Sequence, residues 1–222
     1  MADKIKSSYK FSKRFYDDAI TQGKWWSRLY FKLLWGGVDD KEIARRLLDW
    51  IPDDFSGKQL DVPVGTAVFT AEKYSRMKLA DITCLDYSRD MLEQAAGRFN
   101  EAGINNAKTM QGDVGSLPFD DDTFDYVLCM NGLHVFPNKE KAYAEILRVL
   151  KPGGELLACF YIAGEQKTAD WLAKTVMTRV GWFTPPFDTA ADVRRRLEPS
   201  YDIIDFCVEG AMLYFRARKL LL

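Results

Sequence analysis

Residues 59–70 read QLDVPVGTAVFT, a short apolar strand that runs into a tight turn and then into the start of a helix. One glycine, Gly65, stands in the turn. A strand, turn and helix of this kind let backbone N–H groups approach a ligand closely, and the helix N-terminus favours a negative group there. The stretch therefore predicts a binding loop for a nucleotide-like ligand at the start of an α/β domain.

Strand-like and helix-like segments alternate from residue 60 onward. Further short strands are predicted at residues 82–86, 107–111, 124–130 and 155–162, with helices between them. One helix is capped by Ser88, and another runs from about residue 139 to residue 150 and is closed by Pro152-Gly153-Gly154. Apolar strands separated by amphipathic helices are typical of a mostly parallel sheet covered on both faces. We expect an α/β, doubly wound, seven-stranded sheet.

The ends of the chain differ from this alternating core. Asp39, with Glu42 three residues later, predicts a capping box at the start of a helix. Residues 168–180 predict another helix, and residues 201–209 and 211–218 predict an antiparallel C-terminal hairpin joined at Gly210.

A chain of 222 residues is long enough for one well-filled core, so we expect a single domain. Its parts are an N-terminal helical lid at 1–38, a cofactor-binding core at 39–163, and C-terminal helices and a hairpin at 164–222. The first part is dense in aromatic and basic residues, which also fits an ordinary packing layer or a helix on a membrane surface.

Composition excludes several functional classes. The formal net charge is −1, so no overall field draws the chain to nucleic acid or anionic lipid, and we expect no nucleic-acid partner. The four cysteines are dispersed and His134 is the only histidine, so we expect no metal site. No apolar run is long enough to span a bilayer, and the first residues lack a signal-peptide core. We expect a cytoplasmic protein without stable membrane insertion.

Polar residues follow several of the predicted strands. Asp86 lies about twenty residues beyond the glycine turn, the separation expected for a carboxylate that binds ribose hydroxyls. Asp113 and Asn131 follow the next two strands. In an open α/β sheet the ligand binds beyond the carboxyl ends of the strands, so these residues are expected to meet at one edge.

Five motifs in this order resemble the class I S-adenosylmethionine-dependent methyltransferases, in particular the branch that includes ubiquinone and menaquinone biosynthesis enzymes. The motifs cover roughly the central half of the chain. They are 60–67 (LDVPVGTA), 85–92 (LDYSRDML), 112–119 (GDVGSLPF), 124–134 (FDYVLCMNGLH) and 147–154 (LRVLKPGG).

The resemblance implies S-adenosylmethionine as the cofactor and a role for each matched residue. The first loop would hold the methionine portion, Asp86 the ribose, and Asp113 with Val114 the adenine. Asn131 and Leu133 would face the sulfonium, and Tyr16 would come from the lid. The full predicted cofactor site is Asp61, Val62, Pro63, Val64, Gly65, Thr66, Asp86, Tyr87, Met91, Gly112, Asp113, Val114, Asn131 and Tyr16.

The chain departs from the family pattern in its first loop. Pro63 and Ala67 stand where the family usually has glycine. Proline fixes φ near −65° and removes a donor, so we expect a reshaped turn. Ala67 is expected to be the milder change, adding one methyl group where strand and helix meet.

The leading hypothesis is methyl transfer to an oxygen, carbon or nitrogen nucleophile of a small apolar or aromatic molecule. His134 is the candidate general base, or else a packed structural residue. The alternatives are a non-catalytic protein that binds the cofactor, its demethylated product or a partner, and a nicotinamide-dependent oxidoreductase, which the missing G-x-G-x-x-G disfavours. We expect Asp86→Ala to abolish cofactor binding with little loss of stability.

Overall fold

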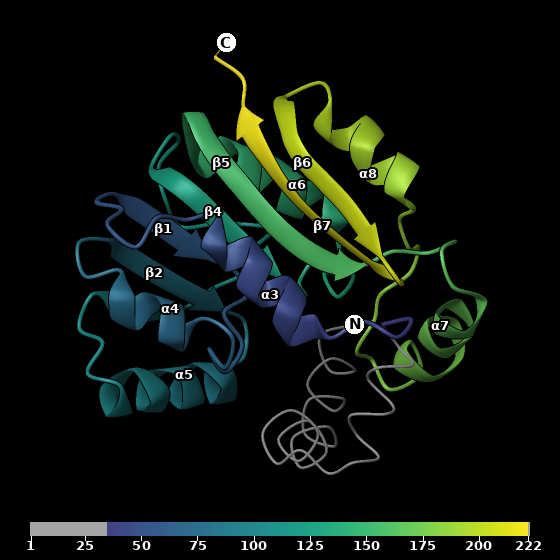
Figure 1. The fold of residues 1–222 in the computed structure, drawn as a ribbon, viewed down its shortest axis with the longest axis horizontal. Helices are drawn as coiled ribbons and strands as arrows, with labels where there is room; N and C mark the ends of the chain where they lie inside the picture. The colour runs from purple at the N-terminus through teal and green to yellow at the C-terminus, as the bar shows by residue number, and fades with distance from the viewer. Residues whose placement is uncertain (1–34, 222) are drawn as a thin grey trace.

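The computed structural model describes residues 35–221, and within them seven strands form one sheet (Figure 1). The strand order is β3-β2-β1-β4-β5-β7-β6. The first five strands are parallel to their neighbours, whereas β7 runs antiparallel to both β5 and β6. The strands are β1 (Lys58–Asp61), β2 (Asp81–Asp86), β3 (Ala107–Gln111), β4 (Phe124–Met130), β5 (Leu150–Tyr161), β6 (Tyr201–Glu209) and β7 (Met212–Lys219). The predicted doubly wound sheet with its C-terminal hairpin is confirmed.

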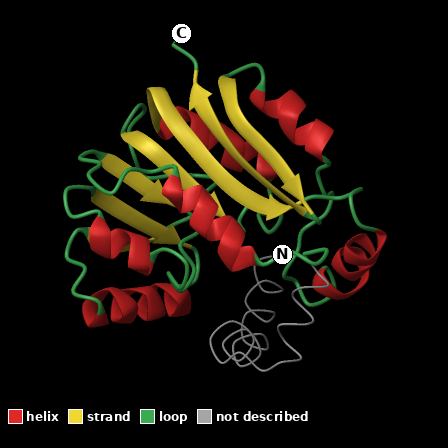
Figure 2. Cartoon of the chain, in the orientation of Figure 1, coloured by secondary structure: helices red, strands yellow, loops and turns green. Residues whose placement is uncertain are grey.

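Helices cover both faces of this sheet (Figure 2). They are α3 (Asp40–Asp49), α4 (Ala71–Arg76), α5 (Arg89–Glu101), α6 (Lys139–Val149), α7 (Lys167–Leu172) and α8 (Ala190–Leu197), with a π-helical turn, η1 (Ala173–Met177), directly after α7. In Figure 1, α3 crosses in front of the sheet and α6 lies behind it.

Two apolar cores lie on the two faces. The first contains buried residues of α3, α4, α5 and α7, among them Ile43, Tyr74 and Phe99. The second contains buried residues of α6 and α8, among them Ile146 and Leu197. Central strands such as β4 contribute to both cores, because successive side chains of a strand point to opposite faces.

Local signals set several helix starts. Ser88 caps α5, and its hydroxyl accepts a hydrogen bond of 3.4 Å from the Met91 N–H, as the sequence predicts. Asp39 caps α3 through the Lys41 N–H at 3.0 Å. The predicted capping box is not formed there, because Glu42 pairs with arginines of its own helix instead.

Two predicted helices end differently in the structure. Helix α6 ends at Val149, and Leu150 already takes an extended conformation and begins β5. The sequence Pro152-Gly153-Gly154 therefore lies inside β5, where a register shift in its pairing with β4 accommodates it. The predicted helix over 168–180 begins as α7 and changes to the π-helical turn η1.

The N-terminal lid predicted over 1–38, including Tyr16, lies almost entirely outside the described residues. Across residues 35–221, each helix is too short or too polar to cross a bilayer.

Candidate functional site

The loop after β1 lies between the ends of two neighbouring strands. Val62 N–H donates to the Leu128 carbonyl of β4 at 2.9 Å, and Val64 N–H donates to the Leu85 carbonyl of β2 at 3.0 Å. Gly65 follows with φ +57°, and the position of a Cβ on this residue has no neighbouring atom within 4 Å. The backbone at Gly65 is thus open to a ligand, at the carboxyl edge of the parallel strands.

Ala67 has the same left-handed φ of +57° but is buried in the first core. An L-residue in this conformation is strained, since Cβ comes close to the backbone. The change from the family's usual glycine therefore affects the backbone as well as adding a methyl group, and it is a larger change than the sequence suggested.

Asp86 ends β2 and fixes this loop. Its Oδ2 accepts a hydrogen bond of 2.9 Å from the Gly65 N–H, and its Oδ1 accepts one of 2.8 Å from the Ser88 N–H. The side chain is buried, and this burial raises its pKa against the opposing effect of the backbone hydrogen bonds. The predicted ribose-binding carboxylate is therefore held in one orientation.

Asp61 ends β1 and is 1% exposed. Its Oδ2 accepts a hydrogen bond of 2.8 Å from the Tyr74 hydroxyl, whereas Oδ1 has no hydrogen-bond partner in the described chain. Burial raises the pKa of this carboxyl to about 7, and the nearby charge of Asp86 adds to the rise while the bond from Tyr74 opposes it.

The segments that follow β2 and β3 present more exposed groups. Asp113 is exposed and accepts a hydrogen bond of 2.8 Å from the Gly115 N–H, while Val114 is buried in the second core. Tyr87 is 54% exposed, and Met91 is half-buried. Gly112 lies so close to the Leu85 side chain that an added Cβ would come within 2.8 Å of it.

The end of β4 meets the first loop directly. A Cβ on Gly132 would lie 2.5 Å from Cδ of Pro63, so the proline ring packs on this glycine. Asn131 has φ +55°, and its buried Oδ1 has no hydrogen-bond partner within residues 35–221. Leu133 is fully buried in the second core. The structure thus brings Pro63 to the β4 loop, a contact that the sequence did not predict.

His134 is enclosed by aromatic rings from distant parts of the chain. Its ring centroid is 4.1 Å from that of Phe183, 5.9 Å from Trp35 and 6.4 Å from Tyr161. Its Nδ1 accepts a hydrogen bond of 3.3 Å from the Tyr161 N–H. Burial lowers its pKa to about 3, and the charge of Lys139 contributes to the fall. The ring is therefore neutral at pH 7.

The segment that carries Phe183 is fastened to the β4–α6 loop. Thr184 donates through its N–H to the His134 carbonyl at 2.9 Å and through its hydroxyl to the Val135 carbonyl at 2.6 Å. The Lys139 ammonium donates to the carbonyls of Thr184 and Pro186 at 2.7 and 2.8 Å. Trp182-Phe183 stands out in the sequence, but no local signal indicates the role of Lys139.

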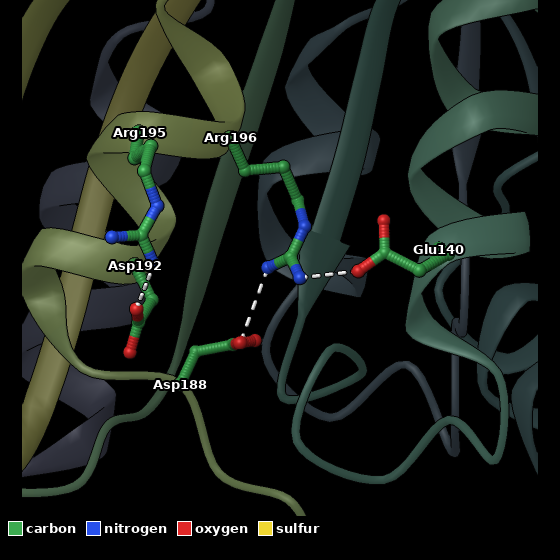
Figure 3. Close-up of a pocket in the computed structure, with 5 residues that line it drawn as sticks. All are labelled: Glu140, Asp188, Asp192, Arg195 and Arg196. Atoms are coloured by element: carbon green, nitrogen blue, oxygen red, sulfur yellow. Dashed lines mark hydrogen bonds and ion pairs between the residues drawn. The ribbon is translucent and has the colours of Figure 1, made fainter.

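A pocket of about 320 Å³ opens on the face covered by α6 and α8 (Figure 3). Arg196 forms ion pairs there with Glu140 at 2.5 Å and Asp188 at 3.2 Å, and Arg195 pairs with Asp192. The charged groups lining the pocket are thus paired with one another, and none is a predicted site residue. This pocket is separate from the loops after β1, β2 and β3.

The comparisons with known proteins agree with this arrangement. Residues 60–154 match the family model described as a methyltransferase domain. The demethylmenaquinone methyltransferase of Bacillus subtilis is 39% identical over 101 residues, which are 45% of this chain and 43% of that protein. This chain therefore matches less than half the length of that relative.

Two solved structures share the fold. The YcgJ protein of Bacillus subtilis has a TM-score of 0.69 at 18% identity, over 82% of this chain and 99% of that one. The [4+2]-cyclase SpnF has a TM-score of 0.67 at 20% identity, over 82% of this chain and 81% of that one. Residues 60–154 of this chain therefore resemble a methyltransferase domain, and the described chain shares the fold of these two proteins.

Proposed function

We propose that this protein transfers a methyl group from S-adenosylmethionine to an oxygen, carbon or nitrogen nucleophile of a small apolar or aromatic molecule. The observation that carries the proposal is the set of acceptor groups at the carboxyl edge of the sheet. Oδ1 of Asp61 and Oδ1 of Asn131 are buried acceptors without a hydrogen-bond partner in the described chain. Buried polar groups are rarely left unpaired, so these oxygens favour a ligand that brings donors and positive charge.

S-adenosylmethionine fits these acceptor groups. Bound S-adenosylmethionine supplies a methyl group on a positively charged sulfur and carries an ammonium group at its methionine end. We assign the methionine portion to the loop from Asp61 to Thr66, the ribose to Asp86, and the adenine to Tyr87, Met91, Gly112, Asp113 and the buried Val114. Tyr16 stays a prediction for the lid.

The remaining task of the protein is to align the acceptor with the methyl group and to exclude water. The rings around His134 support an apolar or aromatic acceptor, since Phe183, Tyr161 and Phe187 pack edge to face or tilted against one another. We assign the acceptor to this end of β4 and β5.

His134 stays the residue to test as general base. A base is most effective when its pKa lies near the working pH, and a pKa of about 3 makes this imidazole a weak base. A His134→Ala variant that keeps full turnover on an identified acceptor would reject the role.

We further infer a cytoplasmic protein that does not act on nucleic acid. The balanced charge, 31 basic against 32 acidic residues, supports this inference because phosphate binding depends on an excess of positive charge.

A cofactor-binding protein without methyl transfer is the second candidate. The packing of Pro63 on Gly132 and the low basicity of His134 favour it. SpnF, which shares this fold, is named as a cyclase, so the fold is not restricted to methyl transfer.

Calorimetric titration of the purified protein tests both candidates. We expect S-adenosylmethionine and S-adenosylhomocysteine to bind with micromolar affinity and NADH not to bind. Binding followed by turnover of a phenolic, quinone-like or amine acceptor would support the enzyme. Binding without turnover across these classes would support the second candidate, and absence of binding would reject both.

A further inference from the structure

A buried chain of hydrogen bonds lies behind the predicted methionine-binding loop. The side-chain amide of Gln59 donates to the Tyr74 hydroxyl at 2.9 Å, and that hydroxyl donates to Oδ2 of Asp61 at 2.8 Å. Gln59 and Tyr74 have no exposed surface, and Asp61 is 1% exposed. Two of these residues belong to β1 and one to α4, so the chain links the central strand to the first helix after the loop.

This arrangement gives the two oxygens of Asp61 different surroundings. Because the Gln59 amide donates to Tyr74, the phenolic proton is directed at Oδ2 of Asp61. Oδ1 is buried as well and has no hydrogen-bond partner among the described residues, while the nearby Thr70 hydroxyl, itself without a partner, acts to lower the pKa of Asp61. One oxygen of the carboxylate, Oδ2, is thus fixed by the Tyr74 hydroxyl, and the other, Oδ1, has no hydrogen bond within residues 35–221.

The groups that act on Asp61 come from each element packed against it. Tyr74 lies on α4, and Thr70, which carries a hydroxyl, directly precedes that helix. Asp86 and Cys84 lie on β2, and Cys129 lies on β4. Each of these groups is neutral or acidic. In the described chain, therefore, no cation among them balances the charge of the Asp61 carboxylate.

We propose that Tyr74 is a positioning residue for the cofactor: it holds Oδ2 of Asp61 so that Oδ1 receives the ammonium group of the methionine portion. This inference rests on the proposed function, because it takes the loop after β1 as the methionine-binding site. Tyr74 touches Asp61 and not the cofactor, so its effect on binding passes through the carboxylate.

Release of a proton when the cofactor binds would distinguish this positioning role from a purely structural role of Tyr74 and Asp61. In the ligand-free protein the pKa of Asp61 is about 7, so the carboxyl is partly protonated near neutral pH. An ammonium group beside Oδ1 favours the ionised form and expels that proton. Binding is then expected to release protons and to weaken as the pH falls below about 7.

Calorimetry in two buffers with different heats of ionisation measures the number of protons released. The probes are S-adenosylhomocysteine and its deaminated analogue, which lacks only the ammonium group. For the unmodified protein we expect proton release with the first probe, none with the second, and a loss of affinity of about tenfold or more for the deaminated analogue, as for a charged hydrogen bond.

The variant Tyr74→Phe removes only the hydroxyl. We expect about tenfold weaker binding of S-adenosylhomocysteine and a shift of proton release to higher pH, because the bond that lowers the pKa of Asp61 is lost. The same substitution should weaken binding of the deaminated analogue only slightly, because that analogue has no ammonium group to contact Asp61. Tyr201→Phe is the matched control, since Tyr201 is buried in the second core and its hydroxyl has no partner within the described residues.

The outcomes separate the inference from the proposed function. If Tyr74→Phe binds both probes as the unmodified protein does, with the same proton release, Tyr74 has no positioning role although the cofactor site stands. If the variant does not fold, calorimetry of the unmodified protein still tests the inference. Equal affinity for both probes and no proton release would then overturn it. Absence of binding of either probe would reject the proposed function itself.

Discussion

The backbone N–H of Gly65 donates a hydrogen bond of 2.9 Å to Oδ2 of Asp86, and this bond joins the loop after β1 to the end of β2. The second oxygen of the same carboxylate accepts from the Ser88 N–H at the start of α5. Asp86 thus connects three segments and orients their backbone donors. Each carboxylate oxygen has a further lone pair, and these could accept from the hydroxyl groups of the ribose that we propose binds here.

The variant Asp86→Ala tests this connection. Two backbone donors lose their partner, so the free energy of unfolding is expected to fall by about 1–3 kcal/mol, more than the sequence suggested. Affinity for S-adenosylmethionine is expected to fall at least tenfold, that is by about 1.4 kcal/mol or more. Urea unfolding and calorimetry measure the two effects.

Asp54→Ala is the matched control for this variant. Asp54 is exposed and precedes β1, at the opposite end of that strand from the loop. Its replacement is expected to change stability by less than about 0.5 kcal/mol and to leave binding unchanged. Unchanged affinity in Asp86→Ala would remove Asp86 from the cofactor site.

Asp61 and His134 are expected to give stability opposite dependences on pH. The folded pKa of Asp61, about 7, is raised from 3.8, so its contribution is fully present below pH 3.8 and is lost as the pH rises through 7. The folded pKa of His134, about 3, is lowered from 6.5, so its contribution is present above pH 6.5 and is lost as the pH falls toward 3. Between these limits the two slopes oppose each other.

Single variants separate the two slopes. Asp61→Asn should lose stability, relative to His134→Gln, on acidification from pH 7 to pH 4.5, because His134 remains and opposes the effect of Asp86. His134→Gln should gain stability over the same range, helped by Asp86, whose pKa is also raised. The slopes are expected to differ by an amount on the order of a few kcal/mol over this range. Equal slopes in both variants, measured by urea unfolding, would contradict the pKa directions.

Gly132 is predicted to tolerate no side chain. An added Cβ would lie 2.5 Å from Cδ of Pro63 and 2.6 Å from Cζ of Phe136, and both are buried or half-buried neighbours. Gly132→Ala is therefore expected to lower the free energy of unfolding by about 1–3 kcal/mol. Because the clash moves Pro63, cofactor affinity should fall as well.

The control for this variant is Gly97→Ala in the middle of α5. A Cβ at Gly97 has no atom within 4 Å, and alanine favours helix over glycine. We expect a gain of about 0.5–1 kcal/mol and no change in affinity. If both variants had the same stability, the packing of Pro63 on Gly132 would be wrong.

Sequence patterns predicted the features of this chain that depend on neighbouring residues. Strands such as β2 and β4 were recognisable as short apolar runs, whereas β3 is mostly exposed and gives a weaker signal. The cap at Ser88 was recognisable because its hydroxyl and the N–H that it binds lie within one helical turn. The position of Asp86 followed from its spacing to Gly65, since Gly65 lies in the loop after β1 and Asp86 ends the adjacent parallel strand β2. These relations are local or repeat with the strand period.

Features that depend on contacts between distant segments were missed. Tyr74 looks like an ordinary buried helix residue, and only the fold brings its hydroxyl to Asp61. The enclosure of His134 requires Trp35 and Phe183, which lie far away in sequence. The start of β5 at Leu150, ahead of the predicted strand at 155–162, was missed because the strand pairing of Leu150 with Phe124 outweighs the local proline and glycine signal.

The hold of Lys139 on the segment around Phe183 gives a further prediction. Lys139→Met keeps the apolar stem but removes both donors to the carbonyls of Thr184 and Pro186. With about 1 kcal/mol of local stability lost, amide hydrogen exchange in residues 181–188 should become about fivefold faster. The Michaelis constant for the acceptor should rise, whereas affinity for the cofactor should not change, because the loops after β1 and β2 are untouched.

Two comparisons make this test specific. Lys141→Met alters an exposed lysine of the same helix and should leave exchange in that segment unchanged. Thr184→Val removes the separate hydroxyl bond to the Val135 carbonyl, and it acts on the same attachment. If the segment opens as one unit, Lys139→Met and Thr184→Val should each accelerate exchange throughout residues 181–188, because both bonds break in the same opening event. Acceleration confined to the amides beside each altered bond would mean that the two bonds hold independent parts of the segment, and that Lys139 does not position Phe183 against His134.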